Sequence, residues 1–76
     1  MTGLGKRITE AREEAKLTKA EFERIIGCSH SLLQAWERGT VKPGVEYLCK
    51  IADATDTTTD WLLGRTIKEN EFEPYV

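Results

Sequence analysis

The chain has 76 residues, which suffices for one small domain and leaves no room for a second. Its composition, with 32% charged and 39% hydrophobic residues, is typical of a globular protein and excludes a wholly disordered chain. No apolar run approaches the roughly 20 residues of a membrane span, and no basic-then-apolar leader is recognisable. We therefore expect a cytoplasmic protein.

The net charge of −2 comes from the end of the chain. Residues 1–65 contain ten Lys or Arg and ten Asp or Glu, whereas residues 66–76 contain one lysine and three glutamates. We therefore divide the chain into a folded domain, 1–65, and an acidic C-terminal tail, 66–76. The domain is neutral overall, so any attraction to a polyanion must come from an uneven distribution of its charges.

The first predicted element is an amphipathic helix near the start of the chain. Its apolar positions recur at spacings of three and four residues, at Leu4, Ile8, Ala11 and Ala15. The other side is expected to be a solvated face that carries Lys6, Arg7, Glu10, Glu13 and Glu14.

A short second helix is predicted to begin at Thr18. Thr18 and Glu21 have the spacing of a capping box, in which each side chain satisfies the backbone amide of the other residue. Phe22, Ile25 and Ile26 follow at helical spacing, so we expect them to form one buried stripe.

A glycine and a serine separate this helix from the next one. Gly27 is expected to end the second helix in a left-handed conformation, and Ser29 to cap the third. Leu33 and Trp36 then lie along one side of the third helix, and Gly39 ends it. The other side is small, polar or basic, and carries His30, Ser31, Gln34, Ala35 and Arg38. Two short helices around a glycine turn are typical of a helix-turn-helix.

The rest of the domain is predicted to contain two more helices. A loop at residues 40–44 leads to a fourth helix, and Thr57 or Thr58 is expected to cap a short fifth helix that ends at Gly64. The apolar stripe of the fourth helix is expected at Val45, Leu48, Cys49 and Ala52, with Ile51 beside it.

The sequence offers no cofactor site, metal site or catalytic constellation. Cys28 and Cys49 are far apart and His30 is the only histidine, so we expect no zinc site and interpret both cysteines as small buried apolar residues. One histidine, without a convergent carboxylate pair or a phosphate-binding glycine loop, does not indicate an enzyme.

Residues 4–64 resemble the DNA-binding domain of the lambda-repressor/Cro family of prokaryotic and phage regulators. The matching segments, in the order of that family, are LTKAEF, GCS, WERG, KPGVEYLCKIAD and TDWLLG. The resemblance implies a compact, all-α, five-helix domain with its helix-turn-helix at the second and third helices. It also implies a transcriptional regulator, in most cases a repressor, that binds double-stranded DNA as a homodimer with its third helix in the major groove.

The resemblance also assigns functional positions along the helix-turn-helix. The base-reading positions are His30, Ser31, Gln34 and Ala35. The phosphate-contacting positions are Lys19, Ser29, Arg38, Thr40 and Lys42. Gln34 is suited to an adenine edge and Ala35 to a thymine methyl group. Lys19 replaces the glutamine that is usual in the family, so it keeps a charge for phosphate but loses the amide that braces the reading side chains.

The same resemblance implies an ion pair between Arg12 and Glu37, which would tie the first helix to the third. It also makes the fifth-helix residues Trp61, Leu62 and Leu63 candidates for a dimer contact.

Two positions depart from the family pattern. Glu23 replaces an alanine that packs against the third helix, so either the helices separate or the carboxylate turns outward. Leu32 replaces a small hydroxyl residue near the reading face. Both changes fit an unusual operator, and both also fit a domain that has kept the scaffold and lost DNA binding.

The second of these interpretations defines an alternative function. The chain would then be a protein-interaction module, such as an antitoxin-like or regulatory partner, that binds another protein through the fifth helix and the tail. The tail places Phe72 and Tyr75 beside acidic residues, which suits a frayed end, an arm docked on its own domain, or a strand exchanged between protomers.

Overall fold

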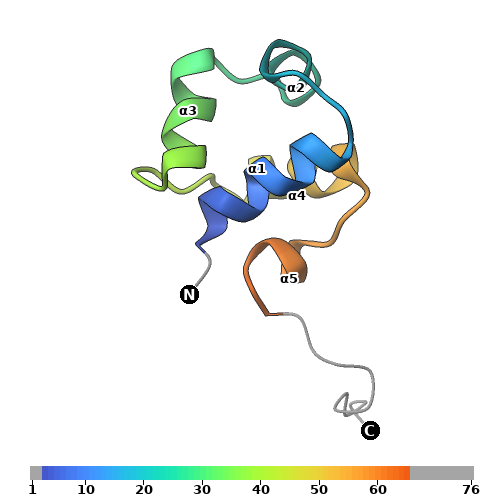
Figure 1. Ribbon diagram of the computed structural model, residues 1–76. Coiled ribbons are helices and arrows are strands. Elements are labelled where there is room, and N and C mark those ends of the chain that lie inside the picture. The colour runs from blue at the N-terminus through green and yellow to red at the C-terminus, as the bar shows by residue number, and fades with distance from the viewer. Residues whose placement is uncertain (1–2, 66–76) are drawn as a thin grey trace, which may run out of the picture.

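The computed structural model describes residues 3–65, which form five helices. In chain order these are α1 (Leu4–Glu14), α2 (Lys19–Ile26), α3 (His30–Arg38), α4 (Val45–Thr55) and α5 (Thr59–Leu62) (Figure 1). The expected all-α, five-helix fold is confirmed. No helix in this part of the chain is long and apolar enough to cross a membrane. The tail at residues 66–76, and with it the expected roles of Phe72 and Tyr75, lies outside the described residues.

Three helices begin at hydroxyl caps. The Thr18 hydroxyl accepts from the Glu21 amide at 3.1 Å, and the Thr18 amide donates to the Glu21 carboxylate at 2.9 Å, which completes the expected capping box. The Ser29 hydroxyl caps α3 by accepting from the Leu32 amide, and the Thr58 hydroxyl caps α5 by accepting from the Trp61 amide. These bonds satisfy amides that have no partner within their own helix, so they fix where each helix starts.

Glycines end the two helices of the helix-turn-helix. Gly27 ends α2 at φ +82° and Gly39 ends α3 at φ +84°, which is left-handed backbone that glycine adopts at little cost. The chain therefore turns sharply after each helix, as the sequence predicts.

One hydrophobic core joins all five helices. Its buried members are Ile8, Ala11, Phe22, Ile26, Leu33, Trp36, Leu48, Ile51, Ala52 and Leu62. Gly5 allows α1 to approach the end of α3 closely, because a methyl group there would overlap the carbonyl oxygens of Trp36 and Glu37. The third helix is thus held against α1 by backbone contact as well as by side chains.

The expected buried stripes of α2 and α4 are wrong in part. Ile25 is exposed, because the narrow contact face of the eight-residue α2 takes only Phe22 and Ile26. On α4, Val45 is 77% exposed and Cys49 is also exposed. The true stripe of α4 consists of Leu48, Ile51, Ala52 and Thr55.

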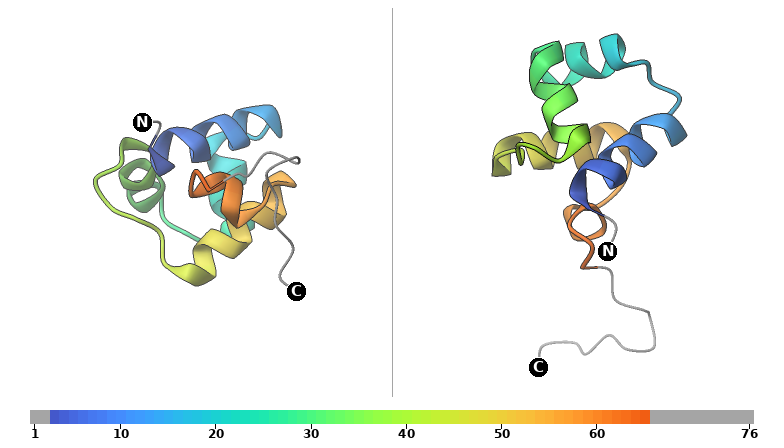
Figure 2. Two further views of the ribbon diagram at one scale, coloured as in Figure 1. Left: turned by 90° about the horizontal axis from the view of Figure 1, so that it is seen from below. Right: turned by 60° about the vertical axis from the view of Figure 1, so that its left-hand side comes forward.

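The helices divide the domain into two ends. In Figures 1 and 2, α2 and α3 lie together at one end and α5 lies at the other, with α1 and α4 between them. Helix α1 packs on α3, α4 packs on α2, and α5 packs on both α1 and α4. The outer side of α3 is therefore left uncovered by the other described elements.

Candidate nucleic-acid interface

The outward side of α3 presents the four residues assigned to base reading. Leu33 and Trp36 point inward and are buried, which fixes the rotation of the helix about its axis. As a consequence the other side faces out, with His30 and Ser31 exposed in its first turn and Gln34 and Ala35 half-buried in its second. Small and polar side chains on an uncovered helix are what a groove of DNA can accept.

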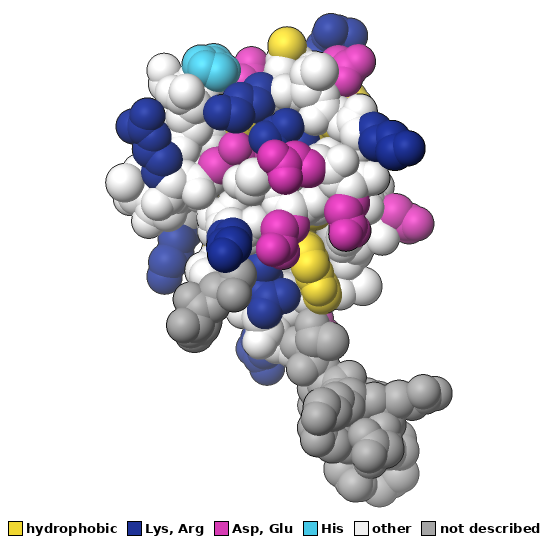
Figure 3. All heavy atoms as spheres, viewed as in Figure 1, with side chains coloured by type: hydrophobic (Ala, Val, Ile, Leu, Met, Phe, Trp, Pro, Cys, Tyr) yellow, Lys and Arg dark blue, Asp and Glu magenta, His cyan; other side chains and the backbone are white. Residues whose placement is uncertain are grey.

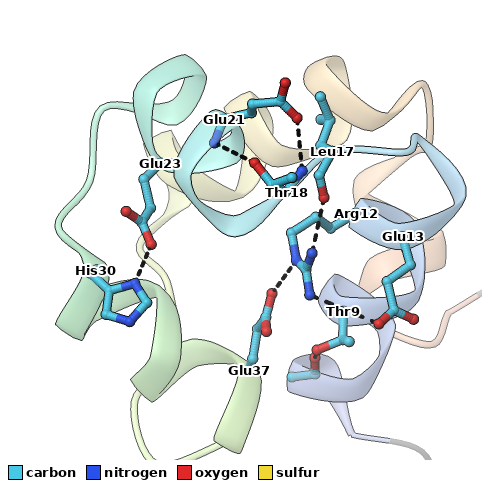
Figure 4. A network of polar contacts seen from close by, with 10 residues as sticks. Thr9, Arg12, Glu13, Leu17, Thr18, Glu21, Glu23, His30 and Glu37 are labelled. Carbon is cyan, nitrogen blue, oxygen red and sulfur yellow. Dashed lines mark hydrogen bonds and ion pairs between the residues drawn. The ribbon is translucent and has the colours of Figure 1, made fainter.

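Helix α3 is tied to α1 by a shielded ion pair. Arg12 Nε donates to Glu37 Oε2 at 2.9 Å, and the two side chains are only 10% and 9% exposed (Figure 4). A second arginine nitrogen, Nη1, donates to the Leu17 carbonyl at 2.9 Å. Arg12 thus joins α1 to α3 and to the segment just before α2. Its role is structural.

A second polar contact joins α2 to the start of α3. Glu23 Oε2 lies 2.6 Å from His30 Nδ1, as Figure 4 shows. The expectation that the Glu23 carboxylate turns outward is therefore wrong, since it turns toward the reading helix, where it is held at 16% exposure. The negative charge of Glu23 and the burial of the thiol together raise the pKa of Cys28, with burial the larger cause.

Basic side chains gather beside the end of α3. Arg38 and Lys42 are exposed and line an open hollow of approximately 330 Å³. Lys6, from the first turn of α1, lines the same hollow. The sequence assigned Lys6 only to a solvated face, because nothing in its local pattern shows that Gly5 brings this turn next to the end of α3.

The remaining phosphate candidates differ in whether they have a donor free to bond a phosphate. Lys19 is half-buried in the first turn of α2, where free backbone amides and the helix dipole also favour an anion. The Ser29 hydroxyl accepts from the Leu32 amide, which leaves its own hydrogen to donate. Thr40 is poorly placed, since its hydroxyl and its amide both already donate to the Ala35 carbonyl. It would have to break a bond to contact phosphate.

The acidic and basic side chains of the helix-turn-helix differ in whether they have a bonding partner. Residues 18–42 contain three glutamates, which bond to the Thr18 amide, His30 and Arg12. The same segment contains four cations, and none of them forms an ion pair with another residue in the range 3–65. These are Lys19, Arg24, Arg38 and Lys42. A neutral domain therefore carries a basic end.

The space-filling view shows this distribution on one face. Lys and Arg side chains, without Asp or Glu, lie along the edge on the side of α3, whereas acidic side chains gather over α1 (Figure 3). The imidazole lies at the surface near the top of the same view. The basic end is therefore also the end that carries the reading side of α3.

The fifth helix combines core and surface. Leu62 is fully buried in the core of its own domain, so as a dimer contact it does not fit this structure, whereas Leu63 is 42% exposed. Trp61 is half-buried and packs under Arg7, whose guanidinium carbon lies 5.3 Å from the ring centroid. Arg7 is therefore not on a solvated face as expected, since it covers the tryptophan.

The sequence analysis missed two features of this interface, namely the position of Lys6 and the contact between Glu23 and His30. Lys6 is far in sequence from Arg38 and Lys42, so only the packing of α1 on α3 brings them together. Glu23 and His30 are seven residues apart, but Gly27 ends α2 between them, so helical periodicity does not predict their contact. The one available signal for Glu23 was a charge on the side of α2 that faces α3.

Comparison with known proteins shows that the chain belongs to a helix-turn-helix family. The profile of a family described as helix-turn-helix matches residues 8–62. The chain is 34% identical over 70 residues to the HTH-type transcriptional regulator ImmR of Bacillus subtilis, covering 90% of this chain and 55% of that protein. It is 36% identical over 59 residues to the regulator AnsR of the same organism, covering 78% of this chain and 51% of AnsR.

Phage repressors are similar in both sequence and structure. The repressor protein C2 of Salmonella phage P22 is 30% identical over 60 residues, which is 79% of this chain and 28% of C2. The crystal structure of the P22 c2 repressor with a synthetic operator superposes with a TM-score of 0.80 at 27% identity, covering 87% of this chain and all of that one. The chain thus spans about half the length of the Bacillus relatives and less of the phage repressor.

Proposed function

Because the chain belongs to the lambda-repressor/Cro type of helix-turn-helix family, we propose that it is a repressor that binds a specific sequence of double-stranded DNA in the cytoplasm. The observation that carries this proposal is the uncovered side of α3, which lies at the basic end of a neutral domain. The P22 c2 repressor, solved with an operator, has the same fold and supports it.

In this function α3 enters the major groove and its first two turns read base edges. Each base pair presents a distinct pattern of donors and acceptors in that groove. Gln34 can bond an adenine edge through two hydrogen bonds, which discriminates by about 1–3 kcal/mol, and Ala35 can contact a thymine methyl group. His30 and Ser31, at the start of α3, reach the neighbouring bases.

Phosphate contacts on both sides of α3 hold it in register. In the chain, Lys19 and Ser29 precede the reading residues, and Arg38 and Lys42 follow them. Lys6 lines the same hollow as Arg38 and Lys42. Such contacts fix the position of the protein on the duplex and do not choose the sequence.

We further propose that two copies bind one two-fold site. Helix α5 lies at the opposite end from α3, so a contact through Leu63 and the edge of Trp61 leaves both reading helices free. Two half-sites one helical turn apart would place those helices roughly 34–36 Å from one another.

The test is a selection of random duplex DNA on the purified chain at low and physiological salt. We expect an inverted-repeat consensus at physiological salt, altered at defined positions by Gln34→Ala and by His30→Ala. An unchanged consensus with both variants would show that the assigned reading side is wrong. Absence of any enrichment at either salt would contradict DNA recognition itself.

Salt dependence provides a separate check on the phosphate contacts. Arg38→Ala and Lys42→Ala should each lower the slope of log affinity against log salt by about 0.9, since each removes one neutralised phosphate. Arg65→Ala is the matched control, because Arg65 follows α5 at the far end of the domain and should leave the slope unchanged. Equal slopes for all three variants would contradict the proposed docking face.

A further inference from the structure

The first residue of the reading helix is held by a side chain of the preceding helix. His30 Nδ1 lies 2.6 Å from Glu23 Oε2, while the imidazole as a whole remains 58% exposed. Helix α2 is itself fixed by the Thr18 capping box at one end and by Gly27 at the other. The backbone that carries Glu23 is therefore fixed, and its side chain is largely shielded, at 16% exposure.

This contact determines which ring nitrogen carries a proton. An ionised carboxylate can only accept hydrogen bonds, so Nδ1 must be the donor. In a neutral imidazole the other nitrogen, Nε2, is then an acceptor with a free lone pair. Free histidine favours the opposite tautomer, with its proton on Nε2, so Glu23 reverses the ordinary preference of the ring.

We propose that Glu23 is a specificity-determining residue that acts through His30. By holding the neutral ring with its proton on Nδ1, Glu23 makes Nε2 an acceptor on the reading side of α3. An acceptor pairs with the amino groups that adenine and cytosine present in the major groove, and it is not matched by the guanine or thymine oxygen atoms. This inference rests on the proposed function and assigns one base position within it.

A merely structural role for the same contact predicts something different. A contact that only ties α2 to α3 would affect stability and the affinity for every DNA sequence alike. A positioning role affects the choice of base at one position. Because removing Glu23 also removes a negative charge from the basic end, affinity rises for all sequences, and the base preference is the quantity to measure.

The tautomer can be measured without DNA. We expect ¹⁵N NMR of the full chain at about pH 8.5, roughly 2 units above the ordinary imidazole value, to show the proton of His30 on Nδ1. Glu23→Met should shift the proton to Nε2, whereas Glu23→Gln should give a mixture of the two tautomers, because its amide can either accept from Nδ1 or donate to it. Glu10→Met is the matched control on the exposed surface of α1. A wild-type ring protonated on Nε2 would overturn the proposal.

The consequence for reading is measured by duplex selection at the same pH. The wild-type chain should favour adenine or cytosine at the base contacted by His30 by roughly five- to tenfold, the size of one hydrogen bond. Glu23→Met should abolish that preference and leave the other positions intact, and it should have no further effect on base choice in a His30→Ala background. Glu23→Gln should weaken it, because its amide permits both tautomers of the ring.

The outcomes separate this inference from the proposed function. A wild-type consensus that Glu23→Met leaves unchanged would overturn the role of Glu23 and leave the repressor function standing. A wild-type chain that selects no sequence would overturn both the function and the reading role, and NMR would then show whether Glu23 still sets the tautomer.

Discussion

The two cysteines have different surroundings, although from the sequence we expect both to be small buried apolar residues. Cys28 is half-buried in the turn between α2 and α3, and burial together with the nearby Glu23 charge raises the pKa of its thiol. Cys49 lies on the exposed side of α4. Composition alone could not distinguish them, because the difference depends on which turn and which helix side the neighbouring helices cover.

This difference predicts the order of thiol modification. Because the thiolate is the reactive form, Cys49 should be alkylated faster than Cys28 at neutral pH. Mass spectrometry after brief treatment with iodoacetamide measures both sites, and Cys28→Ser and Cys49→Ser identify each one. In denaturant the two rates should converge, and faster modification of Cys28 in the folded protein would contradict the structure.

The Arg12–Glu37 pair predicts a large stability effect. Arg12→Met strands the Glu37 carboxylate at a shielded site, so we expect the free energy of unfolding to fall by about 3–5 kcal/mol. Arg12→Met combined with Glu37→Leu should recover most of that loss, because no charge is left without a partner.

Urea denaturation of both single variants and the double variant measures this coupling. Glu13→Gln is the control, since Glu13 lies 3.9 Å from Arg12 but is exposed, and it should change stability by less than about 1 kcal/mol. Losses in the Arg12 and Glu37 variants as small as in this control would show that solvent screens the buried pair as well.

Among the elements, α2 depends strongly on its ends. It has eight residues and its contact face takes only Phe22 and Ile26, so its capping box contributes a large part of its local order. Hydrogen bonds from the Thr18 amide and then from its side chain lower the pKa of Glu21. The ionised form is thus the one that the folded helix favours.

The lowered pKa gives a signed pH dependence. The unfolded chain binds a proton at Glu21 at higher pH than the folded chain, so the contribution of Glu21 is complete above about pH 4.3 and is lost as pH falls below that value. The difference in unfolding free energy between wild type and Glu21→Gln should therefore shrink on acidification.

Urea denaturation from about pH 7 to pH 2.5 measures this difference. Glu10→Gln, on the exposed side of α1, provides the background from a carboxylate outside any cap. A difference for Glu21→Gln that stays constant over the whole range would contradict the role of its charge.

At the scale of the molecule, the proposed reading helix lies at one end of the domain and an exposed apolar surface lies at the other. The basic end carries α3, and the far end carries Leu63 on an exposed surface beside the half-buried Trp61. If two copies associate there, dimerisation and base reading can be changed independently.

Leu63 and its neighbour Leu62 provide that test. Leu63→Glu should leave the stability of the monomer within about 0.5 kcal/mol but weaken self-association and operator affinity. Leu62→Ala should instead cost about 2–5 kcal/mol, because Leu62 is fully buried. Sedimentation and DNA titration of both variants distinguish the cases, and unchanged association of Leu63→Glu would exclude this surface as the contact.

The sequence by itself determined the elements and the fold class of this protein. Hydroxyl caps at Thr18 and Ser29 and glycines at 27 and 39 act over three or four residues, so their bonds are specified locally. The ordered segments from LTKAEF to TDWLLG were enough to predict the family, and the base-reading assignments that follow from it stay a prediction.

Only the tertiary structure decided which residues meet. Glu23 reaches His30 across a turn, Lys6 joins Arg38 because Gly5 permits close packing, and Ile25 and Val45 face outward because their neighbours cover only a narrow face. Helical periodicity predicts which side of a helix is apolar, but it does not determine how packed helices are rotated about their axes or how far apart they lie. Those quantities depend on contacts between segments that are distant in the chain, and they determine the surface offered to DNA.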